Sequence, residues 1–335
     1  MADEKKILLK VRNLKQWFPL NTMFFEKKKY VKAVNDVSFD LYEGETLGIA
    51  GESGCGKSTL IRSCLRLLQP TDGSVEFEGR EISKAKIREL RPIRKDMQII
   101  FQDPYASLDG RWTVTQLIEE PLIVNKLCAS KEERQAKVRE LLEAVSISQE
   151  YVNRYPHEFS GGQRQRIAIA SALATDPKLV MCDEPVSALD VSVRAQVLNL
   201  LKELQKERNL TYIFVSHDMS VIEYLCDRVA IMYLGKIMEI GTREDIFDNP
   251  RHPYTKALLS AVPKVSGELE MDKRIILEGD IPSPVDPPSG CVFRTRCKYA
   301  TERCACMEPK MTNLGNGHSV ACHLLEEDSS QKTQE

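Results

Sequence analysis

The chain of 335 residues has no apolar run long enough to cross a bilayer. No segment approaches the roughly 18 consecutive apolar residues that a spanning helix requires. The amino terminus, MADEKK followed by a short apolar stretch, also lacks the pattern of a secretory signal. These absences lead us to expect a soluble protein that acts at a membrane only through a partner.

An excess of charge of one sign is missing as well. The 47 basic and 49 acidic residues give a formal net charge of -2, and no stripe of basic residues stands out. A chain with this balance has no global field that attracts nucleic acid. We therefore expect no nucleic-acid partner.

Cysteine, by contrast, is abundant. Ten cysteines without a secretory signal indicate a reducing compartment, where disulfides are not expected. Half of them are scattered through predicted helices and strands, where cysteine is usually a small core residue. These are Cys55, Cys64, Cys128, Cys182 and Cys226. Because Cys55 lies in a glycine-rich loop, it is also a possible alkylation target.

That loop, residues 51–59, reads GESGCGKST and matches the phosphate-binding pattern G-x-x-x-x-G-K-[ST] at every position. Residues 46–50 before it predict a buried strand, and residues 60–68 after it predict a helix. Glycines let backbone N–H groups face a polyphosphate, Lys57 adds positive charge at the β/γ-phosphates, and Ser58 offers a hydroxyl to Mg²⁺. The sequence therefore predicts a nucleoside triphosphate site at Gly51, Glu52, Ser53, Gly54, Cys55, Gly56, Lys57, Ser58 and Thr59.

Strand and helix patterns alternate from about residue 7 to 250, which predicts an α/β domain. Helical spacing without strand signals indicates a helical insertion at about 103–160. Further strands are predicted at 33–42, 73–79, 179–182 and 211–215, and a last helix after residues 252–254 that runs to 262. Residues 281–289, IPSPVDPPS, predict a stiff extended segment. We expect residues 251–325 to form a cysteine-containing extension and 326–335 a disordered tail.

An apolar strand pattern at 179–184, LVMCDE, ends in two carboxylates. An aspartate delivered beside a phosphate loop can hold the Mg²⁺ shell, and the next glutamate can orient or deprotonate the attacking water. A buried strand with an acidic end is common by itself. With the phosphate loop upstream, the pattern predicts these roles for Asp183 and Glu184.

The stretch FSGGQRQR at 159–166 opens a predicted helix, with Ser160 as its N-cap. This stretch resembles the signature of ATP-binding-cassette ATPases, carried by Ser160, Gly161, Gly162 and Gln163. Three other stretches resemble elements of that family, and along the chain they stand in the family's order. IIFQD at 99–103 resembles the Q-loop with Gln102, SALD at 187–190 the D-loop, and VSHD at 215–218 the switch with His217.

This resemblance implies an α/β P-loop ATPase with a central mixed or parallel sheet, an antiparallel β subdomain and a helical subdomain. It implies that two such domains meet head to tail, with ATP between one chain's phosphate loop and the partner's signature residues. Glu184, His217 and Gln102 would be catalytic, and Ser58, Gln102 and Asp183 would hold Mg²⁺. An aromatic side chain upstream of the loop would stack on adenine. Tyr30 is the nearest, with Trp17, Phe18, Phe24 and Phe25 as alternatives.

The last third resembles the ATPases of oligopeptide and dipeptide importers. The matching stretches include NPRHPYT at 249–255, SAVP at 260–263 and GCVFRTRC at 290–297, besides RYPHEFS at 154–160 and CDEPVSALDVS at 182–192. The resemblance covers about residues 7–325. It is closest to the F-type subunit, one of the two ATPases in such importers, and the other ATPase, the D-type subunit, is similar.

The resemblance implies an ATPase at the cytoplasmic face of the cell membrane that drives peptide uptake. Its partners would be a D-type ATPase, two permease subunits docked on the helical insertion, and an extracytoplasmic peptide-binding protein. The alternatives are the same machine importing nickel or another small solute, a cassette protein acting on ribosomes or DNA, and a regulatory nucleotide-binding module.

Five cysteines cluster near the carboxyl end, and their spacing lacks the C-x₂₋₄-C pairs of ordinary zinc sites. Some members of the importer family hold a [4Fe-4S] cluster through four such cysteines. The resemblance implies Cys291, Cys297, Cys304 and Cys322 as ligands, with Cys306 as a spare thiol or a replacement for Cys304. A zinc site and unliganded thiols remain the alternatives.

Overall fold

The computed structural model describes residues 6–20, 28–262 and 275–325. The chain forms two compact units. The helical unit contains Tyr42–Thr46 and Lys84–Val215, and the phosphate-loop unit contains Ile7–Leu41, Leu47–Ser83 and the chain from Ser216 onward. Among the described residues, no helix is both long and apolar enough to span a bilayer.

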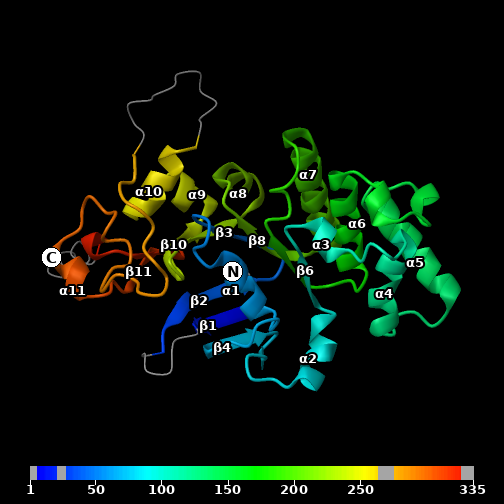
Figure 1. Ribbon diagram of the computed structural model, residues 1–335, viewed down its shortest axis with the longest axis horizontal. Helices are drawn as coiled ribbons and strands as arrows, with labels where there is room; N and C mark the ends of the chain where they lie inside the picture. The colour runs from blue at the N-terminus through cyan, green and yellow to red at the C-terminus, as the bar shows by residue number, and fades with distance from the viewer. Residues whose placement is uncertain (1–5, 21–27, 263–274, 326–335) are drawn as a thin grey trace, which may run out of the picture. The chain divides into compact units, whose positions relative to one another are not determined.

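The phosphate-loop unit carries a four-stranded sheet in the order β2-β1-β4-β5 (Figure 1). Its strands are β1 (Ile7–Pro19), β2 (Tyr30–Tyr42), β4 (Asp72–Phe77) and β5 (Arg80–Glu81). Leu9, Val11 and Leu14 of β1 are fully buried, and an irregularity in the pairing between Arg12 and Lys15 shifts the alternation by one residue. Here the antiparallel β subdomain implied by the family resemblance is present.

A second set of strands in this unit has the order β11-β12-β10-β9-β3. It consists of β3 (Thr46–Ala50), β9 (Arg228–Tyr233), β10 (Lys236–Thr242), β11 (Met311–Gly315) and β12 (His318–Ala321). Strand β3 pairs with β9 in parallel, and the remaining pairs are antiparallel. The C-terminal hairpin β11–β12 thus pairs with β10 through β12 and adds two strands at this edge of the sheet (Figure 1).

The helices of the phosphate-loop unit are short. They are α1 (Lys57–Cys64), α8 (Met219–Leu225), α9 (Arg243–Phe247), α10 (Pro253–Ser260) and α11 (Glu302–Cys306). Residues 281–289 contain no helix or strand, in agreement with the proline-rich pattern.

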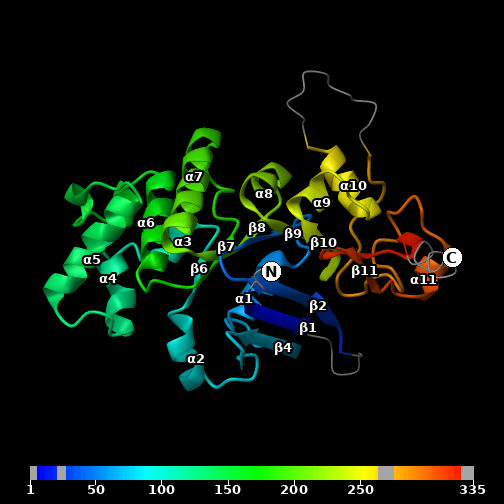
Figure 2. The same cartoon turned by 180° about the vertical axis from the view of Figure 1, so that it is seen from behind.

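The helical unit has the parallel strands β6 (Met97–Ile100), β7 (Leu179–Asp183) and β8 (Thr211–Ser216). Its α-helices are α2 (Ile87–Arg94), α3 (Pro104–Ser107), α4 (Val114–Val124), α5 (Lys131–Ala144), α6 (Gly161–Leu173) and α7 (Val191–Arg208), with 3₁₀ turns at Gln149–Tyr151 and Pro156–Glu158. Helices α4, α5 and α6 pack on one another (Figure 2) through buried residues such as Ile118, Leu141 and Ile167. The segment 103–160 is therefore helical, as its spacing predicts.

Two predicted helix boundaries are wrong. Helix α1 spans Lys57–Cys64 rather than 60–68, because Arg66 takes a left-handed φ of 55° and the N–H groups of Leu67 and Leu68 turn back to the carbonyl of Arg62. Helix α10 ends at Ser260, two residues before the predicted end, and a tight turn from Leu259 to Val262 follows. The predicted disordered tail at 326–335 lies outside the described residues.

Candidate nucleotide-binding site

The phosphate loop lies between β3 and α1, and two of its glycines are required by the packing. Gly51 and Gly56 have φ values of 152° and 106°. A Cβ atom at Gly51 would come within 2.1 Å of the Met232 carbonyl oxygen, and one at Gly56 within 2.0 Å of the Ala33 carbonyl oxygen. Only glycine lets the loop approach these backbones so closely.

Lys57 is held over the loop. Its side chain is buried, and Nζ donates to the carbonyl oxygens of Gly51 over 2.8 Å and Glu52 over 3.0 Å. The loop is also tied to the β9–β10 turn, since Gly235 N–H donates to the Cys55 carbonyl over 2.9 Å. Ser53 and Gly54 form the exposed tip. A buried ammonium with an exposed run of backbone beside it suits a polyphosphate.

The alkylation expectation for Cys55 is not supported. Its thiol is buried, and burial raises its pKa above the ordinary value, which lowers the thiolate fraction needed for alkylation. Of the other scattered cysteines, Cys64, Cys182 and Cys226 are buried as predicted, whereas Cys128 is only half-buried. None of the ten cysteines forms a disulfide in the structure.

Glu52 has partners that sequence reasoning missed. Arg296 donates to both oxygens of its carboxylate, and the backbone N–H of Glu52 donates to the Tyr254 hydroxyl. No local pattern marks Arg296, which lies 244 residues away in sequence. The contact is visible only once the chain has folded.

Two adenine-stacking candidates lie together. The ring centroids of Trp17 and Tyr30 are 6.3 Å apart, and the Lys32 ammonium lies 5.4 Å from the Trp17 ring. Both rings are half-buried, as is Phe18, while Phe24 and Phe25 lie outside the described residues.

His217 follows β8 directly, and its side chain is exposed. The turn that carries it is fixed by Asp218, which caps α8 by accepting a hydrogen bond from the Ser220 N–H over 3.0 Å. The backbone N–H of Asp218 in turn donates to the Ser216 hydroxyl over 3.0 Å. The fold therefore presents this imidazole on an ordered turn.

In the helical unit, the predicted carboxylates follow each other at the end of β7. Asp183 is buried, with 1% of its surface exposed. Glu184 has a φ of 49°, which is strained for a residue with a side chain. Its carbonyl accepts hydrogen bonds from the Ser187 N–H and hydroxyl, over 3.2 and 3.0 Å. Strain of this kind is often found at functional sites.

Gln102 reaches Glu184 from the neighbouring strand. Strands β6 and β7 are parallel and in register, with Ile100 opposite Cys182, so the residues that follow them emerge at one edge. The Gln102 Nε2 atom lies 3.4 Å from Glu184 Oε2. The structure thus brings together two of the predicted catalytic residues.

The signature residues form the amino end of α6. Ser160 is exposed, its hydroxyl accepts from the Gln163 N–H, and Gln163 Oε1 accepts from the Ser160 N–H over 3.0 Å. This reciprocal capping box confirms Ser160 as the N-cap. A Cβ atom at Gly162 would lie 2.3 Å from Val193 Cγ1, so glycine is needed there for the approach of α7.

Three of the four predicted cluster cysteines, Cys291, Cys297 and Cys322, have thiol pKa values above the ordinary value. Burial raises the pKa of Cys291 and Cys322 to about 11 each, and the charges of neighbouring cysteines, among them Cys297 and Cys304, add to both shifts. Cys306 is exposed and takes no part in these interactions. Within the described ranges, however, no three His, Cys, Asp or Glu side chains are close enough together to hold a metal ion. The donor chemistry suits a thiolate-bound metal, but the side chains are not arranged around one point.

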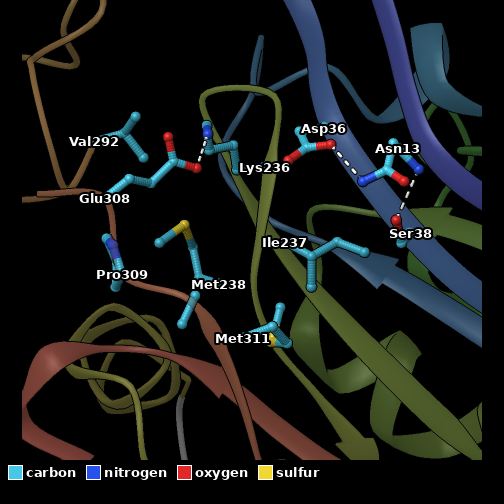
Figure 3. A pocket seen from close by; sticks show the side chains of 11 residues that line it. Asn13, Asp36, Ser38, Lys236, Ile237, Met238, Val292, Glu308, Pro309 and Met311 are labelled. Atoms are coloured by element: carbon cyan, nitrogen blue, oxygen red, sulfur yellow. Dashed lines mark hydrogen bonds and ion pairs between the residues drawn. The ribbon is translucent and has the colours of Figure 1, made fainter. Parts of the chain in front are cut away.

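A cavity of about 230 Å³ lies beside β10 in the phosphate-loop unit, as Figure 3 shows. Its charged groups have partners in its own wall. Asp36 accepts a hydrogen bond from Asn13 over 2.9 Å, and Lys236 forms an ion pair with Glu308. The other walls are largely apolar, and no ligand is assigned here.

Two family models match the chain. The ABC transporter model covers residues 34–187, and the model of the oligopeptide/dipeptide transporter C-terminal region covers residues 238–304. The oligopeptide transport ATP-binding protein OppF of Haemophilus influenzae is 50% identical over 326 residues, which is 96% of this chain and 98% of OppF. The chain belongs to the ATP-binding proteins of oligopeptide and dipeptide ABC transporters.

Other relatives agree with this assignment. AppF of Bacillus subtilis is 50% identical over 96% of this chain and 99% of its own length. The dipeptide transport ATP-binding protein DppF of Haemophilus influenzae is 50% identical over 97% of this chain and 99% of its own length. The dimeric post-hydrolysis structure of the ATP-binding cassette MJ0796, bound to ADP and Pi, matches with a TM-score of 0.63 and 31% identity over 70% of this chain and 99% of that one. This ABC-type ATPase therefore has the cassette fold that its motifs predicted.

Proposed function

We propose that this chain is the ATP-hydrolysing subunit that powers the import of oligopeptides or dipeptides through an ABC permease. Three observations support the proposal: the names of the relatives, the match to the peptide-transporter C-terminal region, and a complete set of ATPase motifs. The observation that carries it furthest is the contact between Gln102 and Glu184, because it joins the two motifs that link hydrolysis to the helical segment.

The phosphate loop binds the triphosphate through its backbone N–H groups and the Lys57 ammonium. Ser58, Gln102 and Asp183 would hold Mg²⁺, which would neutralise charge on the phosphates. Glu184 orients or deprotonates the attacking water, and His217 contacts the γ-phosphate. Tyr30 or the neighbouring Trp17 stacks on adenine.

The signature residues 160–163 act on the nucleotide of a second cassette. Their place at the exposed amino end of α6 supports this role, since a helix amino terminus attracts anions. They engage the γ-phosphate only while ATP is intact, so hydrolysis loosens the pair of cassettes. The dimeric relative bound to ADP and Pi is consistent with such a pair.

The partners are a D-type ATPase as the second cassette, two permease subunits and an extracytoplasmic peptide-binding protein. The chain works at the cytoplasmic face of the membrane. Residues 103–160 dock a permease helix, and their exposed apolar side chains support this, among them Tyr105 and Ile123, which are 65% and 54% exposed.

Peptide uptake tests this proposal. Vesicles reconstituted with this chain, the D-type subunit, both permeases and the binding protein are expected to accumulate labelled peptide only with Mg-ATP. The Lys57→Ala chain in the same assembly is expected to abolish uptake. Uptake of nickel instead of peptide, or peptide uptake that persists with Lys57→Ala, would contradict the proposal.

We propose that Cys291, Cys297, Cys304 and Cys322 would hold a [4Fe-4S] cluster, with zinc and unliganded thiols as the alternatives. Their mutual electrostatic influence and the exposure of Cys306 support this ligand set. Anaerobically purified protein is expected to contain iron and sulfide and to show a visible charge-transfer band. Cys297→Ser is expected to lose the band, while the matched Cys306→Ser keeps it. Stoichiometric zinc without iron would contradict the cluster.

A further inference from the structure

The second residue of the phosphate loop is bound by the C-terminal cysteine segment, defined here as residues 291–297. Arg296 donates from Nη1 to Glu52 Oε2 over 2.7 Å and from Nη2 to Oε1 over 3.1 Å. The Arg296 side chain is only 7% exposed and that of Glu52 24%. This two-pronged geometry is specific to arginine, since lysine offers a single point charge.

The backbone of Glu52 is fixed as well. Its N–H donates to the Tyr254 hydroxyl over 3.0 Å, and its carbonyl accepts from Lys57 Nζ over 3.0 Å. The Tyr254 ring packs on Tyr233 and Phe293, with ring centroids 4.8 and 5.2 Å away, and all three rings are buried. Phe293 belongs to the cysteine segment, so this segment supports both contacts to Glu52.

Arg296 is carried by a tightly turned stretch of that segment. The N–H of Arg294 donates to the Cys291 carbonyl over 3.1 Å, and that of Arg296 to the Phe293 carbonyl over 3.0 Å. The two hydrogen bonds to Glu52 hold the guanidinium in place, and a guanidinium stays protonated in proteins. The guanidinium is therefore a fixed positive charge next to the loop.

Glu52 presents an electrostatic problem that this charge resolves. A carboxylate within a loop that binds a triphosphate repels the ligand, and a half-buried charge amplifies the repulsion because water screens it poorly. Paired with Arg296, Glu52 adds little net charge. The ion pair also holds Glu52 in place, and the backbone carbonyl of Glu52 accepts the hydrogen bond from Lys57.

We propose that Arg296 is a positioning residue for ATP binding: it neutralises Glu52 and holds the phosphate loop in its nucleotide-binding conformation. The C-terminal cysteine segment thereby sets the affinity of the loop for ATP. This inference rests on the proposed function of residues 51–59 as the ATP site. The competing explanation is an ion pair that stabilises the fold without affecting ATP.

Nucleotide binding to the full-length chain separates the two explanations. The dissociation constant is measured by displacement of a fluorescent ATP analogue with ATP, and folding is followed by thermal melting. Arg296→Met is expected to raise the dissociation constant about 10-fold, because it leaves the Glu52 charge unpaired. The double variant Glu52→Gln, Arg296→Met is expected to recover most of that loss. Arg294→Met, which removes hydrogen bonds to the Ser289 carbonyl and hydroxyl, is the matched control and is expected to bind ATP as the wild type does.

The Lys57→Ala variant separates an error in the proposed ATP site from an error in the role of Arg296. Lys57→Ala is expected to lose ATP binding, and wild-type binding by that variant would contradict the proposed site. If Lys57→Ala loses binding while Arg296→Met lowers the melting temperature and leaves the dissociation constant unchanged, the inference is wrong. Should Arg296→Met fail to fold, Arg296→Lys keeps the charge without the two-pronged contact and is expected to bind about threefold more weakly. Unchanged binding by Arg296→Lys and by the double variant would then overturn the inference.

Discussion

The Gln102 amide lies 3.4 Å from the Glu184 carboxylate, so a residue that opens the helical segment contacts the proposed catalytic base. Neither residue is buried, and each follows a parallel strand of the same unit. A displacement of the helical segment would therefore move Gln102 with respect to Glu184. The contact gives a physical route by which a permease docked on residues 103–160 could influence hydrolysis.

Glu184→Gln is expected to retain ATP binding and to lower hydrolysis by about 100-fold or more, because an amide cannot accept the proton of the attacking water. Steady-state phosphate release and nucleotide titration measure the two properties. Glu203→Gln, on the exposed face of α7, is the matched control and is expected to hydrolyse ATP normally. Hydrolysis that continues in Glu184→Gln at the wild-type rate would remove Glu184 from its role.

Gly162→Ala is expected to destabilise the protein by about 1–3 kcal/mol, because the added methyl group would overlap Val193 Cγ1, only 2.3 Å away. Gly161→Ala is the matched control, since its nearest neighbour, Leu189 Cδ2, would be at an ordinary 3.6 Å. Both substitutions raise helix propensity by a similar amount. The difference between their free energies of unfolding in urea therefore measures the effect of the clash. Equal stabilities would refute the close approach of α6 and α7.

The pH dependence of stability is expected to include a contribution from His252. Burial lowers the pKa of His252 to about 3 from its ordinary 6.5, and its Nδ1 accepts the Tyr254 N–H over 3.0 Å. Between these values the unfolded chain binds a proton that the native protein excludes. The contribution of His252 to the free energy of unfolding is therefore fully present above about pH 6.5 and is lost as the pH falls toward 3.

One pH unit below the unfolded pKa, this effect amounts to about 1.4 kcal/mol. Denaturation of the wild type at pH 7.5 and 5.5 measures it. His252→Asn keeps an acceptor for the Tyr254 N–H but cannot titrate, and its stability is expected to fall less over the same interval. Identical losses in the two proteins would exclude His252 as the source.

The sequence predicted the parts of the site that are encoded locally. Strand β3 has the predicted bounds 46–50, and the two carboxylates stand at the end of β7 as expected, because an apolar run bounded by polar residues is a short-range signal. The boundary of α1 was wrong because the left-handed turn at Arg66 leaves no mark in hydrophobic spacing.

Long-range contacts could not be predicted. Glu52 was predicted as a residue of the nucleotide site, but its partner Arg296, 244 residues later in the chain, could not be foreseen. Spacing also left Cys306 as a possible replacement for Cys304. In the fold Cys306 is exposed at the end of α11, whereas Cys304 is half-buried and its carbonyl accepts a hydrogen bond from the Cys291 N–H over 2.8 Å.

Light scattering of the Glu184→Gln chain mixed with its D-type partner tests the central claim, that ATP joins two cassettes. A single chain has a mass of 38.0 kDa. With Mg-ATP, the scattering mass is expected to rise to that of two cassettes. It is expected to stay at one cassette when Ser160 of this chain and the corresponding signature serine of the proposed D-type partner are replaced by Arg. A mass that does not change when Mg-ATP is added to the intact pair would contradict the account.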